Sequence, residues 1–459
     1  MKLNSTWTLH IENFARIESA DIEIAPLMCF IGDNNSGKSY VMSLLWGILT
    51  QSDLLYNNQP KETETYSECK EWILNHIDKR IVALDSNDEQ MYLRWFNELL
   101  EQNKDALIRR IFNTTMIQIG NLKITNFKRK KKLSVKIKSA DKLIVSASKL
   151  LLGKSNRDKI EIAIPTDKKK FESGWWKASL FIAWNLLMTN LTEVVPVDKS
   201  VSGSVYLPAS RTGFLLARRD IARKSIDMTY SLDNNENITR ETLTAPYIQF
   251  LQIFNSIPDT PKIFNDPIKA PLHKFLKENI IYGNISSKLD GQIIRYTPND
   301  LEGQEFPMSI SSSVVTEIAP LLLVLIARIN FASLIIEEPE AHLHPALQKK
   351  IAQLIIRFVH NDIPVWITTH SDTILQHFNN MIKLNNRSIA ERDTLLKQFN
   401  YTSEDLLNIK EIALYQFNRQ EHKTVIQKLQ SGKYGFVVPT FNNSIEELLE
   451  EVFAFQGED

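Results

Sequence analysis

Residues 30–39, Phe-Ile-Gly-Asp-Asn-Asn-Ser-Gly-Lys-Ser, have the composition and spacing of a phosphate-binding loop. Gly32, Gly37, Lys38 and Ser39 occupy the fixed places of the pattern G-x-x-x-x-G-K-[ST]. An apolar run of strand length precedes the loop and an apolar helical stretch follows it, which favours a phosphate cradle over a chance match in a surface loop. The predicted nucleotide contacts here are Gly32, Asp33, Asn34, Asn35, Ser36, Gly37, Lys38, Ser39 and Tyr40.

A nucleotide site built on this loop needs a positive charge near the phosphates, and it needs carboxylates for Mg²⁺ and for the attacking water. Lys38 would place a full positive charge at the β- and γ-phosphates, and the Ser39 hydroxyl would hold Mg²⁺. Far downstream, the apolar residues 334–336 lead into Glu337 and Glu338, so both carboxylates are predicted at the C-terminal edge of a core strand. Glu337 would reach Mg²⁺ directly or through water, and Glu338 would act as the general base. A solvated acidic turn is the alternative.

Further candidates lie at other predicted strand and helix ends. His370 ends a buried strand and is placed to touch the γ-phosphate, although a lone histidine is more often a satisfied polar residue. Arg211 follows another strand and would meet either a phosphate or an acidic neighbour. Three serines, Ser311, Ser312 and Ser313, lie at a predicted helix N-terminus, where they would either cap the helix or bind an anion.

Composition limits the classes of function. The 459 residues are enough for two or three lobes, and Lys+Arg and Asp+Glu are both 54, so no overall field attracts nucleic acid or an anionic membrane. No apolar run reaches the length of a membrane span, and the N-terminus lacks a signal-peptide core. With only Cys29 and Cys69, the chain fits a reducing compartment, and we expect it in the cytoplasm.

The pattern along the chain predicts an α/β fold. Two alternating stretches, residues 7–14 and 19–25, read as antiparallel strands before the loop strand. The basic run at 128–132 is interpreted as a solvated hairpin tip, with a phosphate or acidic-partner site as the alternative. The predicted organisation is an N-terminal core half (1–50), an inserted helical and β region (51–200), a helical lid-like lobe (201–300), a second core half (301–385) and a C-terminal partner-docking region with an acidic helix (386–459).

Taken together, the motifs resemble the ABC-type ATPase heads of the OLD, RecF and SMC group. Their order is phosphate loop, serine-rich signature, twin glutamates within Glu-Pro-Glu-x-x-Leu-His-Pro, then Thr-Thr-His-Ser. The resemblance covers roughly 1–50 and 300–380 plus the turn at 207–211, and it implies a mixed sheet with a P-loop core, antiparallel N-terminal strands and inserted elements. It implies ATP and Mg²⁺ as ligands, Glu338 as base and His370 as switch.

The same resemblance implies partners. The serine signature would reach the nucleotide of a second subunit in a head-to-head dimer. Two departures are Ser313, where relatives have glycine, and Glu337, where many have aspartate. No coiled coil interrupts the head, and the C-terminal segment lacks a strand ending in Asp-x-Asp, so the chain is most similar to ATPase subunits of bacterial anti-phage systems.

Among these subunits, the AriA family of the PARIS systems is the most similar. That family implies a homo-oligomeric scaffold that holds a separate TOPRIM nuclease effector and responds to a phage trigger protein. The alternatives are a Septu-like ATPase paired with an HNH nuclease and a RecF-like DNA-binding repair ATPase. Whether DNA is bound stays open.

Overall fold

The protein is described here from a computed structural model. The structure describes residues 3–140, 154–156, 158–165, 167–189, 191, 202–230, 243–259, 266–289, 292–301, 303–327, 329–432, 435–438, 449–452 and 454–455. The acidic helix predicted near the C-terminus falls largely outside these residues. Within them, no helix is both long and apolar enough to cross a membrane.

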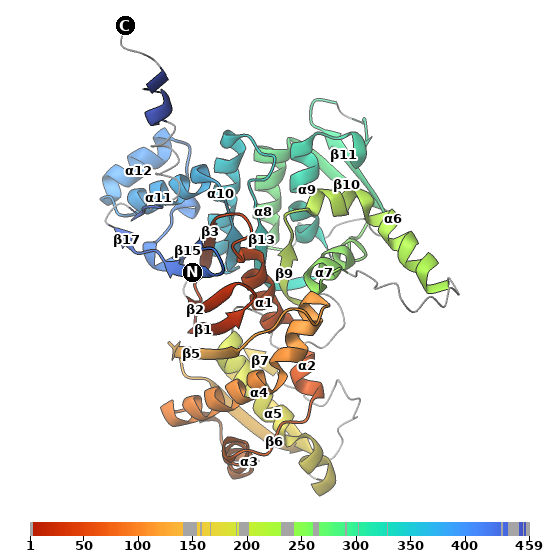
Figure 1. Cartoon of the computed structure of the whole chain (residues 1–459), viewed down its shortest axis with the longest axis vertical. Helices are drawn as coiled ribbons and strands as arrows, with labels where there is room; N and C mark the ends of the chain where they lie inside the picture. Colours follow the sequence, from red (N-terminus) through yellow and green to blue (C-terminus); the bar gives the residue numbers. More distant parts are fainter. Residues whose placement is uncertain are drawn as a thin grey trace.

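A nine-stranded mixed sheet organises the chain (Figure 1). Strands β15, β3, β14, β13 and β9 run parallel, whereas β5, β1 and β2 form an antiparallel ribbon, and β16 joins the two parts. In sheet order the strands are β5 (Asn121–Arg129), β1 (Ser5–Phe14), β2 (Ile17–Glu23), β16 (Thr424–Lys428), β15 (Ile412–Arg419), β3 (Leu27–Gly32), β14 (Val365–Thr368), β13 (Asn330–Glu337) and β9 (Ser202–Leu207). The predicted fold class, with its P-loop core and antiparallel N-terminal strands, is confirmed.

The parallel strands are apolar throughout because both faces of the sheet are covered. Along β3, Met28 and Phe30 belong to one buried cluster, and Leu27, Cys29 and Ile31 belong to another. Alternate side chains of a strand point to opposite faces, so the two clusters lie on opposite sides of the sheet. The carboxyl ends of β3, β14, β13 and β9 meet at one edge, which we call the carboxyl edge.

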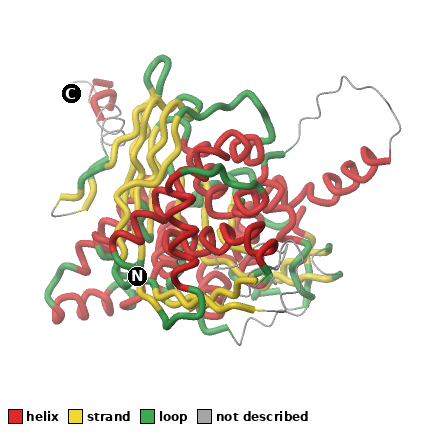
Figure 2. Tube along the Cα trace, turned by 90° about the horizontal axis from the view of Figure 1, so that it is seen from below, coloured by secondary structure: helices red, strands yellow, loops and turns green. Residues whose placement is uncertain are grey.

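Helices cover the two faces. Helix α1 (Lys38–Thr50) contributes to the Met28–Phe30 cluster, as do α3 (Glu64–His76), α4 (Ser86–Phe112) and α5 (Lys168–Met188). The opposite cluster draws on α7 (Ala245–Phe254), α8 (Lys269–Leu276), α9 (Ser313–Ile326), α10 (Pro345–His360), α11 (Asp372–Asn385) and α12 (Ile389–Gln398). Helix α6 (Arg211–Tyr230) projects from the body in both views (Figures 1 and 2).

Smaller sheets lie outside the nine-stranded sheet. Helices α3, α4 and α5 pack with β4 (Val82–Ala83), β6 (Ser134–Ala140), β8 (Lys159–Pro165) and β7 (Lys154–Asn156), and we call this group the inserted lobe. Helix α2 (Ser52–Asn57) leads into it. The remaining strands are β10 (Gly283–Lys288), β11 (Ile293–Pro298), β12 (Phe306–Pro307), β17 (Ser431–Gly432) and β18 (Gly435–Phe436). Within the described residues there are also a π-helical turn (Lys277–Ile281) and the 3₁₀ turns Met308–Ile310, Ser403–Asp405 and Ile409–Glu411.

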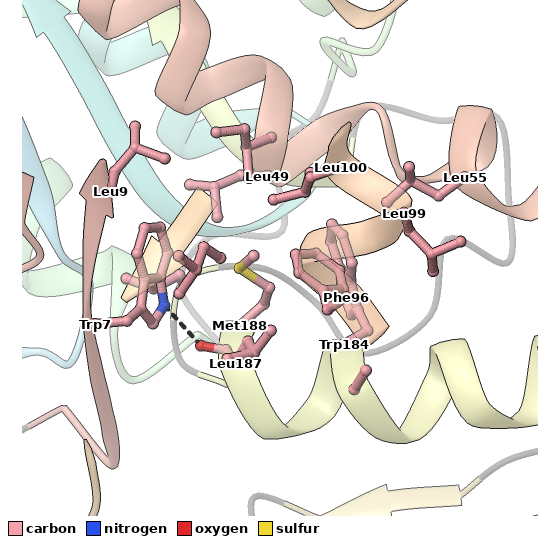
Figure 3. Close-up of a cluster of buried hydrophobic side chains, with 14 of the residues drawn as sticks. Trp7, Leu9, Leu49, Leu55, Phe96, Leu99, Leu100, Trp184, Leu187 and Met188 are labelled. Atoms are coloured by element: carbon pink, nitrogen blue, oxygen red, sulfur yellow. Dashed lines mark hydrogen bonds between the residues drawn. The ribbon is translucent and has the colours of Figure 1, made fainter. Parts of the chain in front are cut away.

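Apolar packing and several hydrogen bonds join the inserted lobe to the central sheet, and two of these bonds share one acceptor. The buried carbonyl of Leu187 in α5 accepts from Trp7 Nε1 at 2.9 Å and from Ser5 Oγ at 3.1 Å. Phe96 and Trp184 pack nearby with ring centroids 6.2 Å apart (Figure 3). Both donors lie in β1, so this seam ties α5 directly to the sheet.

Two expectations about organisation change. The basic run at 128–132 is not a hairpin tip, because β5 belongs to the nine-stranded sheet and β6 to the small sheet. Its Arg129 side chain is fully buried and donates to the carbonyls of Asn185 and Leu186 at 3.2 and 3.0 Å. The core sheet is also wider than the two predicted halves, because each of the five predicted segments supplies at least one of its strands.

Candidate functional site

The turn between β3 and α1 has the backbone of an anion cradle. Gly32 (φ +128°), Asn35 (φ +59°) and Gly37 (φ +98°) lie in the left-handed region. Glycine adopts this region without steric cost, and asparagine tolerates it better than most residues. A Cβ at Gly32 would also lie 2.2 Å from the Phe417 carbonyl oxygen, because β15 pairs with β3 at this point. The first glycine is therefore required by both conformation and space.

Lys38 begins α1 and lies buried beneath the loop. Its ammonium donates to the carbonyls of Gly32 at 2.8 Å and Asp33 at 2.7 Å. Burial lowers the pKa of Lys38, and the nearby carboxylates of Glu338, Asp33, Glu337 and Glu340 oppose that shift. A phosphate at the loop would supply the counter-charge that a buried ammonium needs.

The other predicted loop residues differ in exposure. Ser36 is buried, and its Oγ has no hydrogen-bond partner among the described residues. Tyr40 is half exposed and packs edge-on against Phe14 and obliquely against Phe112. The exposed members are Asp33, Asn34, Asn35 and Ser39. A buried hydroxyl without a partner fits a loop built around a ligand oxygen.

The two glutamates follow β13 directly and have different environments. Glu337 is 2% exposed, and its Oε2 accepts from the backbone N–H of Ala209 at 3.2 Å, whereas Oε1 has no partner in the described part of the chain. Glu338 is half-buried and has φ +43°. Its N–H donates to the carbonyl and the hydroxyl of Thr368 at 3.0 and 3.2 Å. Such strained backbones cluster at functional sites.

Residues 368–371 continue from β14, the strand between β3 and β13. His370 lies near Lys38, and burial together with that positive charge lowers its pKa, which favours the neutral imidazole. Glu340 holds this segment: one carboxylate oxygen accepts from Thr369 Oγ1 at 2.8 Å and from the His370 N–H at 2.6 Å. Burial raises the pKa of Glu340. Sequence reasoning did not single out Glu340, although it belongs to the same Glu-Pro-Glu motif.

Arg211 lies behind the glutamates at the start of α6. It is 3% exposed and forms an ion pair with Glu317 of α9 at 2.6 Å. It also donates to the backbone carbonyls of Glu337 at 2.7 Å and Glu338 at 3.0 Å. The structure therefore shows the pairing with an acidic neighbour that was one of the two interpretations, and a direct nucleotide contact by Arg211 stays a prediction.

The serine cluster forms the N-terminal end of α9. Ser312 caps the helix by accepting from the N–H of Val315 at 3.4 Å, and Ser311 Oγ donates to the Pro307 carbonyl at 3.1 Å. Ser312 and Ser313 are exposed. The capping role is thus present. Contact with the nucleotide of a second subunit remains a prediction.

The arrangement suits a nucleoside triphosphate with a divalent cation. Lys38 and the loop N–H groups lie at the carboxyl end of β3. The carboxylates of Glu337 and Glu338, at the carboxyl end of β13, lie close enough to Lys38 to oppose the lowering of its pKa. Mg²⁺ prefers oxygen ligands and is usually bound by one or two protein side chains plus phosphates. The Ser39 hydroxyl and the unpartnered Glu337 Oε1 fit that requirement.

Comparison with known proteins places the chain among ATPases. The model of the AAA ATPase domain matches residues 1–375. No curated protein matches the sequence. Three solved SMC heads are similar in fold at low sequence identity. The head bound to the C-winged helix domain of ScpA has 11% identity, a TM-score of 0.33 and coverage of 92% of this chain and 97% of that chain.

The SMC head domain from Thermotoga maritima has 8% identity and a TM-score of 0.34, with coverage of 94% of this chain and 100% of that chain. The Smc head domain with an extended coiled coil, bound to the C-terminal domain of ScpA and derived from Pyrococcus furiosus, has 9% identity and a TM-score of 0.33. The match covers 98% of this chain and 99% of that chain. TM-scores of this size carry no argument about mechanism, so the assignment rests on the family model. That model spans most of the chain, including the phosphate loop and both glutamates, and the chain therefore belongs to the AAA ATPase domain family.

Proposed function

We propose that the chain hydrolyses ATP at the carboxyl edge and that Glu338 is the general base. One observation carries this proposal. Glu338 is a non-glycine residue in the left-handed region, held there at the end of β13 by Thr368 and Arg211, while its carboxylate interacts electrostatically with Lys38. A backbone strain of about 1–3 kcal/mol persists only where the surroundings impose it.

Different residues would bind the phosphates and accept the proton. Lys38 and the loop N–H groups would hold the β- and γ-phosphates, and Glu338 would take a proton from the attacking water. Neutral His370 would contact the γ-phosphate. Mg²⁺, held by Ser39 and Glu337, would supply charge neutralisation between the phosphates.

The test is Glu338→Gln, which keeps size and hydrogen bonding but removes the base. Turnover of ATP should fall by about 10²- to 10⁴-fold while the Kd for ATP stays within about threefold of wild type. The matched control is Glu71→Gln, because Glu71 is an exposed carboxylate of α3 and its loss should leave turnover unchanged. Wild-type turnover by Glu338→Gln would refute the assignment.

We infer further that this ATPase is the regulatory subunit of a bacterial anti-phage system, most similar to the AriA subunit of PARIS, and acts in the cytoplasm. It would form homo-oligomers through head-to-head dimers, hold a separate TOPRIM nuclease effector and respond to a phage trigger protein. Three features support this: the resemblance of the motif set, the equal numbers of acidic and basic residues, and the exposed serine end of α9, available to a second copy.

Co-expression with the neighbouring genes, followed by pull-down and native mass spectrometry, tests the regulatory role. A stoichiometric second chain with a TOPRIM sequence would support it, and an HNH sequence would favour the Septu-like alternative. A lone dimer that binds DNA with ATP would favour the RecF-like alternative. In the basic run the Arg129 side chain is fully buried, whereas Lys128, Lys130, Lys131 and Lys132 are exposed, so four positive charges remain at the surface for that alternative.

A further inference from the structure

The guanidinium of Arg211 is the junction of three elements of the site. Nε donates to the Glu317 carbonyl at 3.2 Å, and one terminal nitrogen donates to the carbonyls of Pro208 at 3.3 Å and Glu337 at 2.7 Å. The other terminal nitrogen donates to the Glu338 carbonyl at 3.0 Å and pairs with Glu317 Oε1 at 2.6 Å. The same planar group therefore bonds both to α9 and to the backbone that carries the predicted base.

Glu317 is the counterpart of Arg211 on the serine helix. It lies one helical turn after Ser313, is 1% exposed, and also accepts a hydrogen bond from Thr212 Oγ1. A buried carboxylate is costly unless it is paired and hydrogen-bonded. Here the pair links the start of the second turn of α9 to the first turn of α6, so the serine end of α9 is fixed relative to Arg211.

The backbone of Glu338 is anchored on both sides. Its N–H donates to Thr368, and its carbonyl accepts from Arg211 and from the Ala341 N–H, each at 3.0 Å, so its φ of +43° lies between anchors on both sides. Without Arg211, the carbonyl keeps only the Ala341 N–H, so the residue is held less firmly in the left-handed region, which is strained for a residue with a side chain. The carboxylate would then lose its fixed position.

We propose that Arg211 and Glu317 are positioning residues that hold Glu338 in its working geometry and connect it to the serine end of α9. This inference rests on the proposed role of Glu338 as base. The serine end is exposed, so a group that binds there acts on an element tied to the base by two charged side chains.

Arginine is required here for its shape as well as its charge. A lysine at position 211 keeps the charge opposite Glu317, but its single ammonium cannot reproduce a planar fork that bonds to four carbonyls at once. Arg211→Lys therefore removes the bridge without leaving an unpaired buried carboxylate. The loss of one or two charged hydrogen bonds predicts a fall in kcat of about ten- to hundredfold, which corresponds to about 1.4–2.7 kcal/mol.

Arg357→Lys is the matched control. Arg357 makes a comparable two-pronged pair with Asp405, at 2.7 and 3.1 Å, and Asp405 is fully buried. Arg357 lies about 18 Å along α10 from the N-terminal end of that helix, and the N-terminal end is the one that follows Glu337 and Glu338 in the chain. Both variants should lose similar stability in chemical denaturation. Only Arg211→Lys should lower kcat, with the Kd for ATP within about threefold of wild type in both.

The deciding measurement is a double-mutant cycle with Glu338→Gln. If Arg211 acts through Glu338, Arg211→Lys slows turnover in the wild-type background but has no further effect in the Glu338→Gln background. Equal effects in both backgrounds, or wild-type kcat in Arg211→Lys, would overturn the positioning role. Wild-type turnover by Glu338→Gln alone would instead overturn the assignment of the base.

A second variant pair keeps the test valid if Arg211→Lys folds poorly. Arg211→Gln with Glu317→Gln removes both charges together, so the folded state carries no unpaired buried charge. The double variant should be more stable than either single variant yet remain as slow as the slower of them. Recovery of turnover together with stability would show a purely structural pair.

Discussion

The carboxyl edge and the interior of the inserted lobe are both buried, but they bury different kinds of side chain. The edge contains Lys38, Glu337, Arg211 and Glu317, each under a tenth exposed. The lobe interior contains rings and aliphatic side chains such as Phe96, at 0% exposed. One region encloses charge and a strained backbone, and the other encloses apolar surface.

The difference separates what holds the fold from what does the chemistry. Burial of apolar surface stabilises a protein by about 25 cal/mol per Å². Burial of charged groups costs free energy unless every charge is paired and hydrogen-bonded. We therefore expect changes in the lobe to act on stability and changes at the edge to act on nucleotide binding and turnover. Three substitutions test this separation.

Phe96→Ala should have the largest effect and should act on stability alone. The ring packs against Trp184 in the cluster at the seam, and its loss leaves a cavity that typically costs about 3–5 kcal/mol (Figure 3). Denaturant unfolding should show a lower midpoint, and amides of α4 and α5 should exchange faster. The ATP affinity of the folded fraction should stay at the wild-type value; a tenfold loss would show that the two regions are not separate.

Lys38→Ala should produce the opposite pattern. Loss of the charged contacts to phosphate predicts a rise in the Kd for ATP of at least about a hundredfold. Without nucleotide, the variant loses two hydrogen bonds from the ammonium to the Gly32 and Asp33 carbonyls, so the unfolding free energy should fall by about 1–3 kcal/mol, less than for Phe96→Ala. Calorimetric titration with ATP and unfolding without nucleotide measure the two effects. A large loss of stability would mean that the ammonium is needed for the loop itself.

Ser5→Ala should have the smallest effect and examines the seam between the regions. It removes one donor from the Leu187 carbonyl, which keeps its bond from Trp7 Nε1. Because the carbonyl stays partnered, the expected cost is about 1 kcal/mol in unfolding free energy. Turnover should be unchanged. A fall in kcat would indicate that α5 influences the carboxyl edge through β1.

The parts of the site that the sequence could predict are those built from local patterns. The loop at 32–39 and the strand ending in Glu337 combine a motif with an apolar run, and neither needs a distant residue to be identified. The structure has β3 at Leu27–Gly32 directly before the loop and α1 at Lys38–Thr50 directly after it, in the predicted order. The strand before His370 was predicted on the same grounds.

The parts that could not be predicted depend on partners distant in sequence. The hairpin interpretation of 128–132 assumed that the strands on either side pair with each other, whereas β5 and β6 belong to different sheets. The acceptors that bury Arg129 belong to α5, more than fifty residues away. For Arg211 the sequence left two partners open, because only the packing of α6 against α9 brings Glu317 to it. β16 was missed, since its five residues are mostly exposed.

The place of β3 in the sheet has a consequence for protein synthesis. Its two neighbours, β14 and β15, are made long after it, and Gly32 is held against Phe417. At ordinary ribosome speeds, roughly 20–80 s pass between the synthesis of Gly32 and that of Phe417. During that interval the nascent chain carries a nucleotide motif without the strands that shape it. We expect the ribosome-bound chain not to bind ATP until β15 has been made and can pair with β3, so a product truncated before β15 would not compete for the ligand.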